Sequence, residues 1–309
     1  MHFADRLFAA CLEKNSRLVV GLDPHPHLLP PHIIAAQKKE RRTSQRLIMA
    51  QAIAAFNLAV IPAIADYAVA VKPQLSLYEP WGPAGIAAYE TTVEAAHQAG
   101  LIVIADAKRN DIGTSAEGYA AAFLGTGSAA GTEEALAPPW EADAVTINPY
   151  LGSDGVAPFL QRAARGKGVF ALVRTSNPSA VQVQNLLVGE TPVFIKVAEL
   201  VHAWGAQTLG ECGYSALGAV VGATDPSAAK TLRKVMPHAV FLVPGFGAQG
   251  GSAADVAVAF DKDGLGAIVN SSRDILFAYR TFGDEHAFAA AARQAAQEAN
   301  ARINAALGK

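Results

Sequence analysis

The sequence is poor in cysteine and in charge. Its two cysteines, Cys11 and Cys212, are far apart among 309 residues, so they form neither a disulfide framework nor a metal-binding spacing. This scarcity is typical of a reducing compartment, and we predict a cytoplasmic protein. Charged residues make up 17% of the chain, and the formal net charge is -2. Such a balance predicts neither a nucleic-acid partner nor attraction to an anionic membrane.

Signals for secretion or membrane insertion are also missing by inspection. The first 18 residues mix acids with bases, and we interpret them as an amphipathic helix, not a signal peptide. We count no apolar run that approaches the roughly 20 residues of a membrane span, so no membrane partner is expected. Hydrophobic residues make up 51% of the chain. This is enough for a large buried core, and it argues against disorder.

Several motifs of common enzyme classes are absent. There is no GxGxxG after the first apolar run, no GxxxxGK[ST] and no nucleophile elbow. Their absence argues against dinucleotide binding, P-loop chemistry and serine-hydrolase chemistry. Three histidines, His25, His27 and His32, share one proline-rich loop. Their spacing is irregular and no carboxylate triad accompanies them, so a loop role is favoured over metal ligation.

Short apolar runs recur along the chain, each followed by a polar or glycine-rich segment and then a helical pattern. The runs lack polar alternation, so each is expected to be covered on both faces. Eight of them predict an α/β fold, a (β/α)8 TIM barrel forming a single domain over residues 1–309 after an N-terminal helix. A doubly wound open sheet is the competing arrangement. The expected strands are residues 18–22, 68–71, 101–105, 144–147, 169–173, 217–221, 240–243 and 267–269.

Three insertions interrupt this pattern, at about residues 24–45, 125–139 and 177–191. The first is rich in basic residues, which we interpret as a solvated face. The second precedes the fourth strand, so it is expected on the face of the barrel opposite the active one. The third follows the fifth strand on the active face, and it is a candidate lid.

One stretch, residues 101–120, organises the candidate chemistry. A buried strand there leads into Asp106, Lys108 and Asp111. Side chains alternate along an extended segment, so Asp106 and Lys108 should point the same way. Charges at the mouth of an apolar strand are costly to desolvate unless they pair with each other or with a ligand. The alternative is a structural ion-pair cluster, and the rest of the chain must decide between the two.

Other strand ends supply groups that would converge with this stretch in a barrel. Asp23 and Lys72 end the first two strands, and with Asp106 and Lys108 they would form an alternating array of acids and bases. Such an array can keep ammonium groups charged while one acid faces a substrate anion. After the fifth strand, Ser176 and the following asparagine offer neutral groups for an amide or imide edge, unless they form an ordinary turn.

The last two strands end in a predicted phosphate site. The seventh is followed by VPGFGAQGG, Val243–Gly251, whose glycines let backbone N–H groups approach an anion. The eighth is followed by Arg273, whose planar fork of donors suits phosphate oxygens. Loops after these two strands are the usual phosphate site of this barrel. Taken alone, the glycine-rich segment could be a pair of ordinary turns, and Arg273 could be an ordinary surface arginine.

Seven segments resemble, in order, the orotidine 5'-phosphate decarboxylase family, in particular its bacterial branch with the DAKRxDI motif. They span nearly the whole chain, which makes the match specific. The segments are GLDP at Gly21–Pro24, VKPQ at Val71–Gln74, DAKRNDIGT at Asp106–Thr114, NPYLG at Asn148–Gly152, TSNP at Thr175–Pro178, PGFGAQGG at Pro244–Gly251 and SSRDI at Ser271–Ile275.

The resemblance implies decarboxylation of orotidine 5'-monophosphate to UMP in pyrimidine biosynthesis. It also implies a homodimer with shared active sites and no metal or cofactor. Lys108 would protonate carbon 6 of the pyrimidine, Asp106 would press against the substrate carboxylate, and Lys72 would complete the charged network. Binding energy from the distant phosphate would drive loop closure.

The remaining implied contacts surround the nucleotide. Asp111 would enter the partner subunit's site and touch the ribose together with Thr114, a role for which Ser115 is the alternative. The other contacts would be Asp23 to the ribose hydroxyls, Ser176 to the pyrimidine imide, and Gln249, Gly250, Gly251 and Arg273 to the phosphate.

Two rival functions remain open on the same scaffold. A phosphosugar barrel, such as a 3-keto-hexulose-phosphate synthase, shares an Asp-x-Lys strand end but needs a divalent metal. The additional Lys72 and the Arg-Asn-Asp after Lys108 favour the metal-free site. A catalytically silent nucleotide sensor is the second rival, and it has no need for paired lysines at such a desolvation cost.

Overall fold

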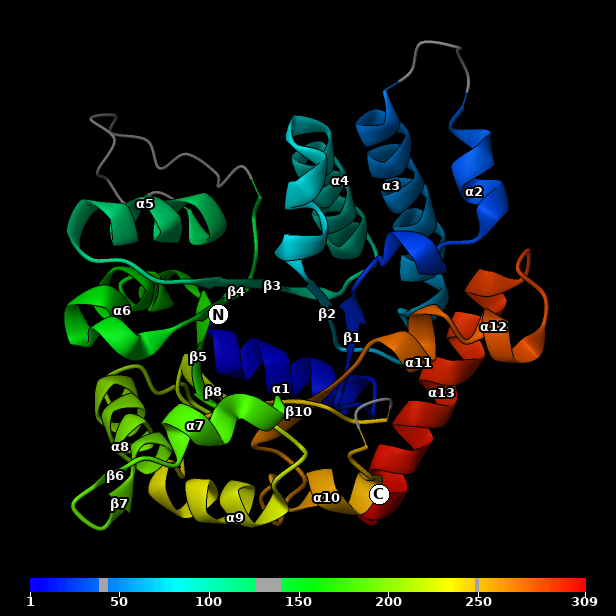
Figure 1. Cartoon of the computed structure of the whole chain (residues 1–309). Helices are drawn as coiled ribbons and strands as arrows, with labels where there is room; N and C mark the ends of the chain where they lie inside the picture. Colours follow the sequence, from blue (N-terminus) through cyan, green and yellow to red (C-terminus); the bar gives the residue numbers. More distant parts are fainter. Residues whose placement is uncertain (39–43, 126–139, 248–249) are drawn as a thin grey trace.

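The computed structural model describes residues 1–38, 44–125, 140–247 and 250–309. Within these ranges, eight parallel strands close into a barrel in the order β1-β10-β9-β8-β5-β4-β3-β2. Helices surround the barrel (Figure 1), so the predicted single-domain (β/α)8 fold is confirmed. The barrel strands are β1 (Leu18–Leu22), β2 (Ala70–Pro73), β3 (Ile102–Arg109), β4 (Ala144–Ile147), β5 (Gly168–Arg174), β8 (Leu217–Val221), β9 (Phe241–Pro244) and β10 (Ala267–Ser271).

The helices alternate with the strands along most of the chain. The α-helices are α1 (Phe3–Glu13), α2 (Pro31–Ala36), α3 (Gln45–Ile64), α4 (Pro83–Gln98), α5 (Gly113–Leu124), α6 (Ser153–Leu160), α7 (Val181–Gln184), α8 (Val193–Gly205), α9 (Pro226–Val235), α10 (Ala253–Ala257), α11 (Arg273–Leu276), α12 (Tyr279–Phe282) and α13 (Phe288–Ala306). Single 3-10 turns cover Pro26–Leu28, Leu75–Leu77, Glu79–Trp81, Pro149–Leu151, Ala163–Arg165 and Pro178–Ala180.

The N-terminal helix α1 covers the amino ends of the strands. It is amphipathic, as predicted, and its buried face includes Phe3, Leu7 and Phe8. Phe3 packs edge-on against Phe170 of β5, with ring centroids 6.0 Å apart. A side chain at Gly168, the first residue of β5, would collide with the ring of Phe3. Figure 1 shows α1 lying across the barrel, so the helix closes the end of the barrel that is opposite to the strands' carboxyl ends.

Helix α3 corrects one expectation from the sequence. The helix has 20 residues and is long and apolar enough, by length and composition alone, to cross a membrane, so the prediction that no apolar segment approaches this length was wrong. Half of its most apolar window is buried within the protein, where the helix packs against α4 and α13. Its buried Asn57 donates hydrogen bonds to the Tyr78 hydroxyl, at 2.9 Å, and to Thr92 Oγ1, at 3.0 Å. An apolar helix of this kind is therefore used here as a core helix.

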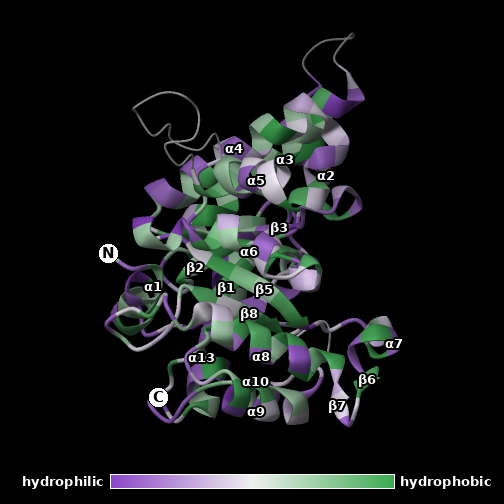
Figure 2. Cartoon of the chain, turned by 90° about the vertical axis from the view of Figure 1, so that its left-hand side faces the viewer, coloured by the Kyte–Doolittle hydropathy of each residue, from purple (hydrophilic) through white to green (hydrophobic). Residues whose placement is uncertain are grey.

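The insertion at 177–191 contains structure that the sequence pattern did not predict. It holds α7 and the first strand of a small antiparallel hairpin, β6 (Leu187–Val188) with β7 (Thr191–Pro192). Figure 2 shows α7, β6 and β7 standing out from the barrel. Arg174 ties this segment to the barrel, because its guanidinium donates to Asn185 Oδ1 at 2.7 Å and to Asp225 Oδ2 at 3.0 Å.

The other two insertions fall partly outside the described residues. The first, at 24–45, contains a 3-10 turn and α2 before α3 begins, and residues 39–43 lie outside the described ranges. The predicted insertion at 125–139 lies outside them except for Gly125, which ends α5 with a positive φ of 95°.

Candidate active site

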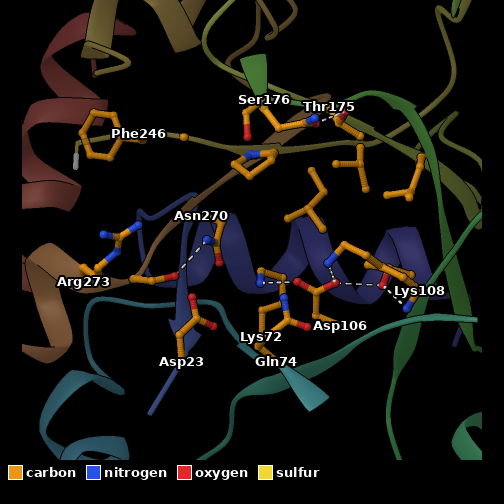
Figure 3. A pocket seen from close by; sticks show the side chains of 18 of the residues that line it. Asp23, Lys72, Gln74, Asp106, Lys108, Thr175, Ser176, Phe246, Asn270 and Arg273 are labelled. Atoms are coloured by element: carbon orange, nitrogen blue, oxygen red, sulfur yellow. Dashed lines mark hydrogen bonds and ion pairs between the residues drawn. The ribbon is translucent and has the colours of Figure 1, made fainter. Parts of the chain in front are cut away.

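A cavity of about 440 Å³ opens at the carboxyl ends of the barrel strands. Residues from all eight barrel strands, or from the segments that directly follow them, meet around it (Figure 3). It is therefore the place where the polar strand ends converge, as the barrel prediction requires. The lining residues are Asp23, His25, Lys72, Gln74, Asp106, Lys108, Thr146, Leu172, Thr175, Ser176, Asn177, Val220, Leu242, Pro244, Gly245, Phe246, Asn270, Ser272 and Arg273.

Two lysines share one carboxylate at the floor of this cavity. Lys72 Nζ lies 2.6 Å from Asp106 Oδ2, and Lys108 Nζ lies 2.5 Å from Asp106 Oδ1. The side chains of Lys72 and Asp106 are each 7% exposed, whereas that of Lys108 is 45% exposed. The buried pair thus holds a more accessible ammonium group at the cavity surface. The predicted convergence of these three residues is confirmed.

The charges of the array stabilise one another against burial. Burial alone would raise the pKa of Asp106, but the two lysines outweigh this effect and hold it below its usual range. Burial would likewise lower the pKa of Lys72, yet the carboxylates of Asp106 and Asp23 raise it above its ordinary value. The carboxylate and its buried lysine are therefore both ionised near neutral pH.

The backbone of β3 departs from a regular strand at Lys108. The strand extends to Arg109, beyond the predicted end at Ala105, and its register with β4 shifts between these two residues. Lys108 has a φ of +47°, which is the left-handed region that few non-glycine residues adopt. Its N–H donates to Thr146 Oγ1 at 3.0 Å, and that hydroxyl in turn donates to Asp106 Oδ1 at 3.0 Å. Thr146 of β4 therefore fixes both the strained backbone and the carboxylate.

The wall formed by β1 and β10 carries unused acceptors. Asp23 Oδ1 and Asn270 Oδ1 are both buried without a hydrogen-bond partner among the described residues. Asn270 Nδ2 donates to Ser272 Oγ at 3.3 Å. A side chain at Gly21 would collide with that serine hydroxyl, so the glycine lets the two strand ends approach. Buried acceptors without partners suit a ligand that brings hydroxyl or N–H donors.

Ser176 lies in the cavity, after β5, in the position predicted from the sequence. Its neighbour Thr175 is held by Gln184 of α7, which accepts from the Thr175 N–H at 3.1 Å and donates to its hydroxyl at 2.7 Å. The segment 177–191 thus contacts the cavity wall directly through α7.

Arg273 lies at the other end of the cavity from Lys108 (Figure 3). Gly250 and Gly251 do not line the cavity, and their N–H groups donate within their own loop, to the Gly247 and Gly245 carbonyls at 2.7 and 3.0 Å. Their predicted phosphate contacts would therefore need this loop to rearrange. Gln249, predicted to share that role, lies outside the described residues.

Asp111 and Thr114 do not line this cavity in the single chain. Asp111 follows β3, and its carboxylate accepts from the Ile112 N–H at 2.8 Å. Thr114 and the alternative Ser115 are exposed in the first turn of α5. The structure therefore separates these residues from the lysine pair of their own chain, and their predicted role in a partner's site stays a prediction.

Comparison with known proteins shows the family. Residues 16–281 match the model of the orotidine 5'-phosphate decarboxylase / HUMPS family. The chain belongs to this family. A relative from Rhodopirellula baltica is 45% identical over 281 residues, which are 91% of this chain and 90% of the relative. One from Caldicellulosiruptor bescii is 40% identical over 286 residues, covering 91% and 92% of the two chains. Both are named orotidine 5'-phosphate decarboxylase, a carboxy-lyase.

A solved structure supports the same family. The Leishmania donovani OMP decarboxylase has a TM-score of 0.74 and 31% identity, and the match covers 100% of both chains. The resemblance drawn from the seven sequence segments is therefore confirmed for the family and for the fold.

Several residues of this family member line the cavity but were missed from the sequence. Thr146 and Asn270 are polar side chains within otherwise apolar strands, and this interruption was the available signal. Gln74 lies two positions after Lys72, so alternation along the strand could have placed it. Leu172, Val220 and Leu242 gave no such signal, because apolar residues in barrel strands are expected in the core.

Proposed function

We propose that this family member converts orotidine 5'-monophosphate to UMP and carbon dioxide, with no metal or cofactor, as a step of pyrimidine biosynthesis. The observation that carries the proposal is the Lys72–Asp106–Lys108 array, which places a half-exposed ammonium beside a buried, ionised carboxylate. A cation fixed in this way suits a reaction that develops negative charge on carbon. Its cytoplasmic location stays a prediction.

The two ends of the cavity suit the two ends of the nucleotide. Arg273 at one end would bind the phosphate, with help from Gln249, Gly250 and Gly251 once their loop has closed. Asp23, whose Oδ1 lacks a partner, would accept from ribose hydroxyls. Ser176 would contact the imide edge of the pyrimidine. The base would then lie with its carboxylate toward the lysine array.

In the proposed reaction the bond between carbon 6 and the carboxylate breaks, and carbon dioxide leaves. The electron pair of the broken bond stays on carbon 6, which then takes a proton from the Lys108 ammonium. Water later returns a proton to Lys108. Asp106 would repel the substrate carboxylate but neither carbon dioxide nor the uncharged ring of UMP. Because the ammonium meets full negative charge only as the carbanion forms, Lys108 lowers the barrier more than it strengthens substrate binding.

A metal-dependent reaction of the phosphosugar type is the rival within this family. Both oxygens of Asp106 already accept from lysine ammonium groups, which compete with a cation for the same lone pairs. We therefore expect unchanged turnover in excess chelator. Loss of turnover in chelator, restored by added divalent metal, would favour the rival.

The shared dimer site is supported by the surface around Asp111. Ile112, next to Asp111 in the chain, is a large apolar side chain that is 52% exposed, and contact with a partner subunit would bury it. Mixing two inactive variants, Lys108→Ala and Asp111→Ala, tests this arrangement. If each site uses Lys108 from one subunit and Asp111 from the other, half of the dimers are mixed and each has one intact site. About a quarter of the wild-type activity should return, whereas no recovery would contradict shared sites.

The decisive experiment follows the loss of orotate absorbance with purified protein and orotidine 5'-monophosphate. Wild-type protein should turn over, and Lys108→Ala should not. Tight binding of the nucleotide without turnover by the wild type would favour a sensor. Substantial turnover by the variant would refute Lys108 as the proton donor.

A further inference from the structure

Two histidines and a glutamate meet outside the active site, where the α2 insertion packs on the C-terminal part of the chain. His32 is the second residue of α2, and Glu285 and His286 lie between α12 and α13. One ligand atom from each of the three lies within 4.8 Å of the others. Among the described residues, these are the histidines and acids whose spacing suits a metal ion.

The donor atoms of this cluster are incompletely used. His32 Nδ1 is buried and has no hydrogen-bond partner among the described residues. It lies 3.7 Å from Glu285 Oε1, which is too far for a hydrogen bond. The rings of His32 and His286 stack with centroids 4.2 Å apart. The buried His32 ring nitrogen thus lies close to the Glu285 carboxylate and the His286 imidazole. A cation placed among these three groups would give each of them a partner.

We propose that His32, Glu285 and His286 bind a divalent transition-metal ion of the Zn²⁺ type. Two imidazoles and a carboxylate are ligands that zinc accepts, with water in the fourth position. Ligand atoms of a tetrahedral zinc site are roughly 3.4 Å apart, as follows from metal–ligand bonds of about 2.1 Å. The three ligand atoms now lie within 4.8 Å of one another, and rotation of these partly exposed side chains would bring them closer.

The metal would join two segments that both lead into the active site. The segment holding His32 begins just after Asp23, and the segment holding His286 follows α12, which comes after the short helix α11 that starts at Arg273. The two already meet where the Tyr279 hydroxyl donates to the Leu28 carbonyl at 2.8 Å. A bound ion would add a stronger link, and it would stabilise the native state because the unfolded chain does not hold the three ligands together.

The test uses the full-length, untagged protein after dialysis against chelator. Titration calorimetry with ZnCl₂ should show one saturable site per chain, and Co²⁺ should give a visible absorption band. Thermal unfolding should shift to higher temperature with Zn²⁺. The variants His32→Ala and His286→Ala should lose all three signals, and Glu285→Gln should weaken zinc binding about tenfold or more.

A second histidine pair provides the matched control. His202 and His238 stack with centroids 6.4 Å apart, and among the described residues no carboxylate completes a metal cluster there. His202→Ala should therefore leave zinc binding unchanged. Circular dichroism and urea unfolding would check that the variants fold.

Three results would overturn the proposal: no saturable zinc binding by the wild type, binding that persists in both His32→Ala and His286→Ala, or binding that is lost in the control. The Glu285→Gln variant, at a partly exposed position, keeps the test valid if either alanine variant does not fold. None of these results depends on whether the cavity decarboxylates orotidine 5'-monophosphate.

Discussion

Replacing Thr146 by valine should slow the chemical step without weakening substrate binding. The side chain is 1% exposed, and valine has nearly the same shape but no hydroxyl. The change removes the bond to ionised Asp106 and leaves the Lys108 N–H without its acceptor. Each loss has a typical free-energy cost of about 1.5–3 kcal/mol. Lys108 would then no longer be held in its left-handed conformation.

If the free-energy cost of one of these lost hydrogen bonds is added to the barrier of the chemical step, kcat should fall about 10- to 100-fold. KM should change by less than about threefold, since the phosphate end of the cavity is untouched. The assay is the absorbance of orotidine 5'-monophosphate over a range of concentrations, with urea unfolding measured in parallel. Thr146→Ser restores the hydroxyl and should recover most of kcat.

A control threonine separates catalysis from stability. Thr92 of α4 is also fully buried, accepts from Asn57 Nδ2 at 3.0 Å and donates to the Ala88 carbonyl at 2.7 Å. Thr92→Val should lower the free energy of unfolding by a similar amount but leave kcat unchanged. Unchanged kcat in Thr146→Val, or an equal loss of kcat in Thr92→Val, would refute Thr146 as a positioning residue.

Two further predictions concern the ends of the cavity. Arg273→Ala should raise KM about 10- to 100-fold through loss of a charge-assisted phosphate contact, while the exposed Arg280→Ala serves as control; an unchanged KM would count against phosphate capture. Burial alone would raise the pKa of Asp106, but the two lysines hold it below its usual value. The ionised Asp106 carboxylate therefore stabilises the fold above about pH 4, and this contribution is lost as the pH falls below that value. Asp106→Asn should therefore flatten the acid-side decline in urea-unfolding free energy between pH 7 and pH 3. At pH 7 it should lower that free energy by about 3–5 kcal/mol, because Lys72 is left buried and unpaired.

The barrel and its charged array were accessible from the sequence because both depend on local signals. Eight apolar runs followed by polar residues predict parallel strands whose ends converge, and Asp106 and Lys108 share a face whenever the segment is extended. The actual β3 is irregular, with Lys108 at positive φ. The prediction of a shared cavity was right, although the backbone that produces it is not a regular strand.

Other features depend on contacts between distant parts of the chain. Thr146 is recognisable only once β4 lies beside β3, because its role is to bond with residues about 40 positions earlier. The cluster around His32 involves Glu285 and His286, some 250 positions later. The sequence instead groups His32 with His25 and His27, and so it did not indicate these two neighbours. The β6–β7 hairpin has two-residue strands, too short for a periodic pattern.

Helix α1 has a consequence for how reactants would move through the molecule. Its aromatic face plugs the amino end of the barrel, where Phe3 rests on Phe170. In the proposed reaction, carbon dioxide released at the floor of the cavity would meet this packed layer on one side, so we expect it to leave by the opening through which the nucleotide arrived. Substrate entry and carbon dioxide release would then use the same opening of the cavity. A segment that covers this opening would therefore control both steps of each catalytic cycle.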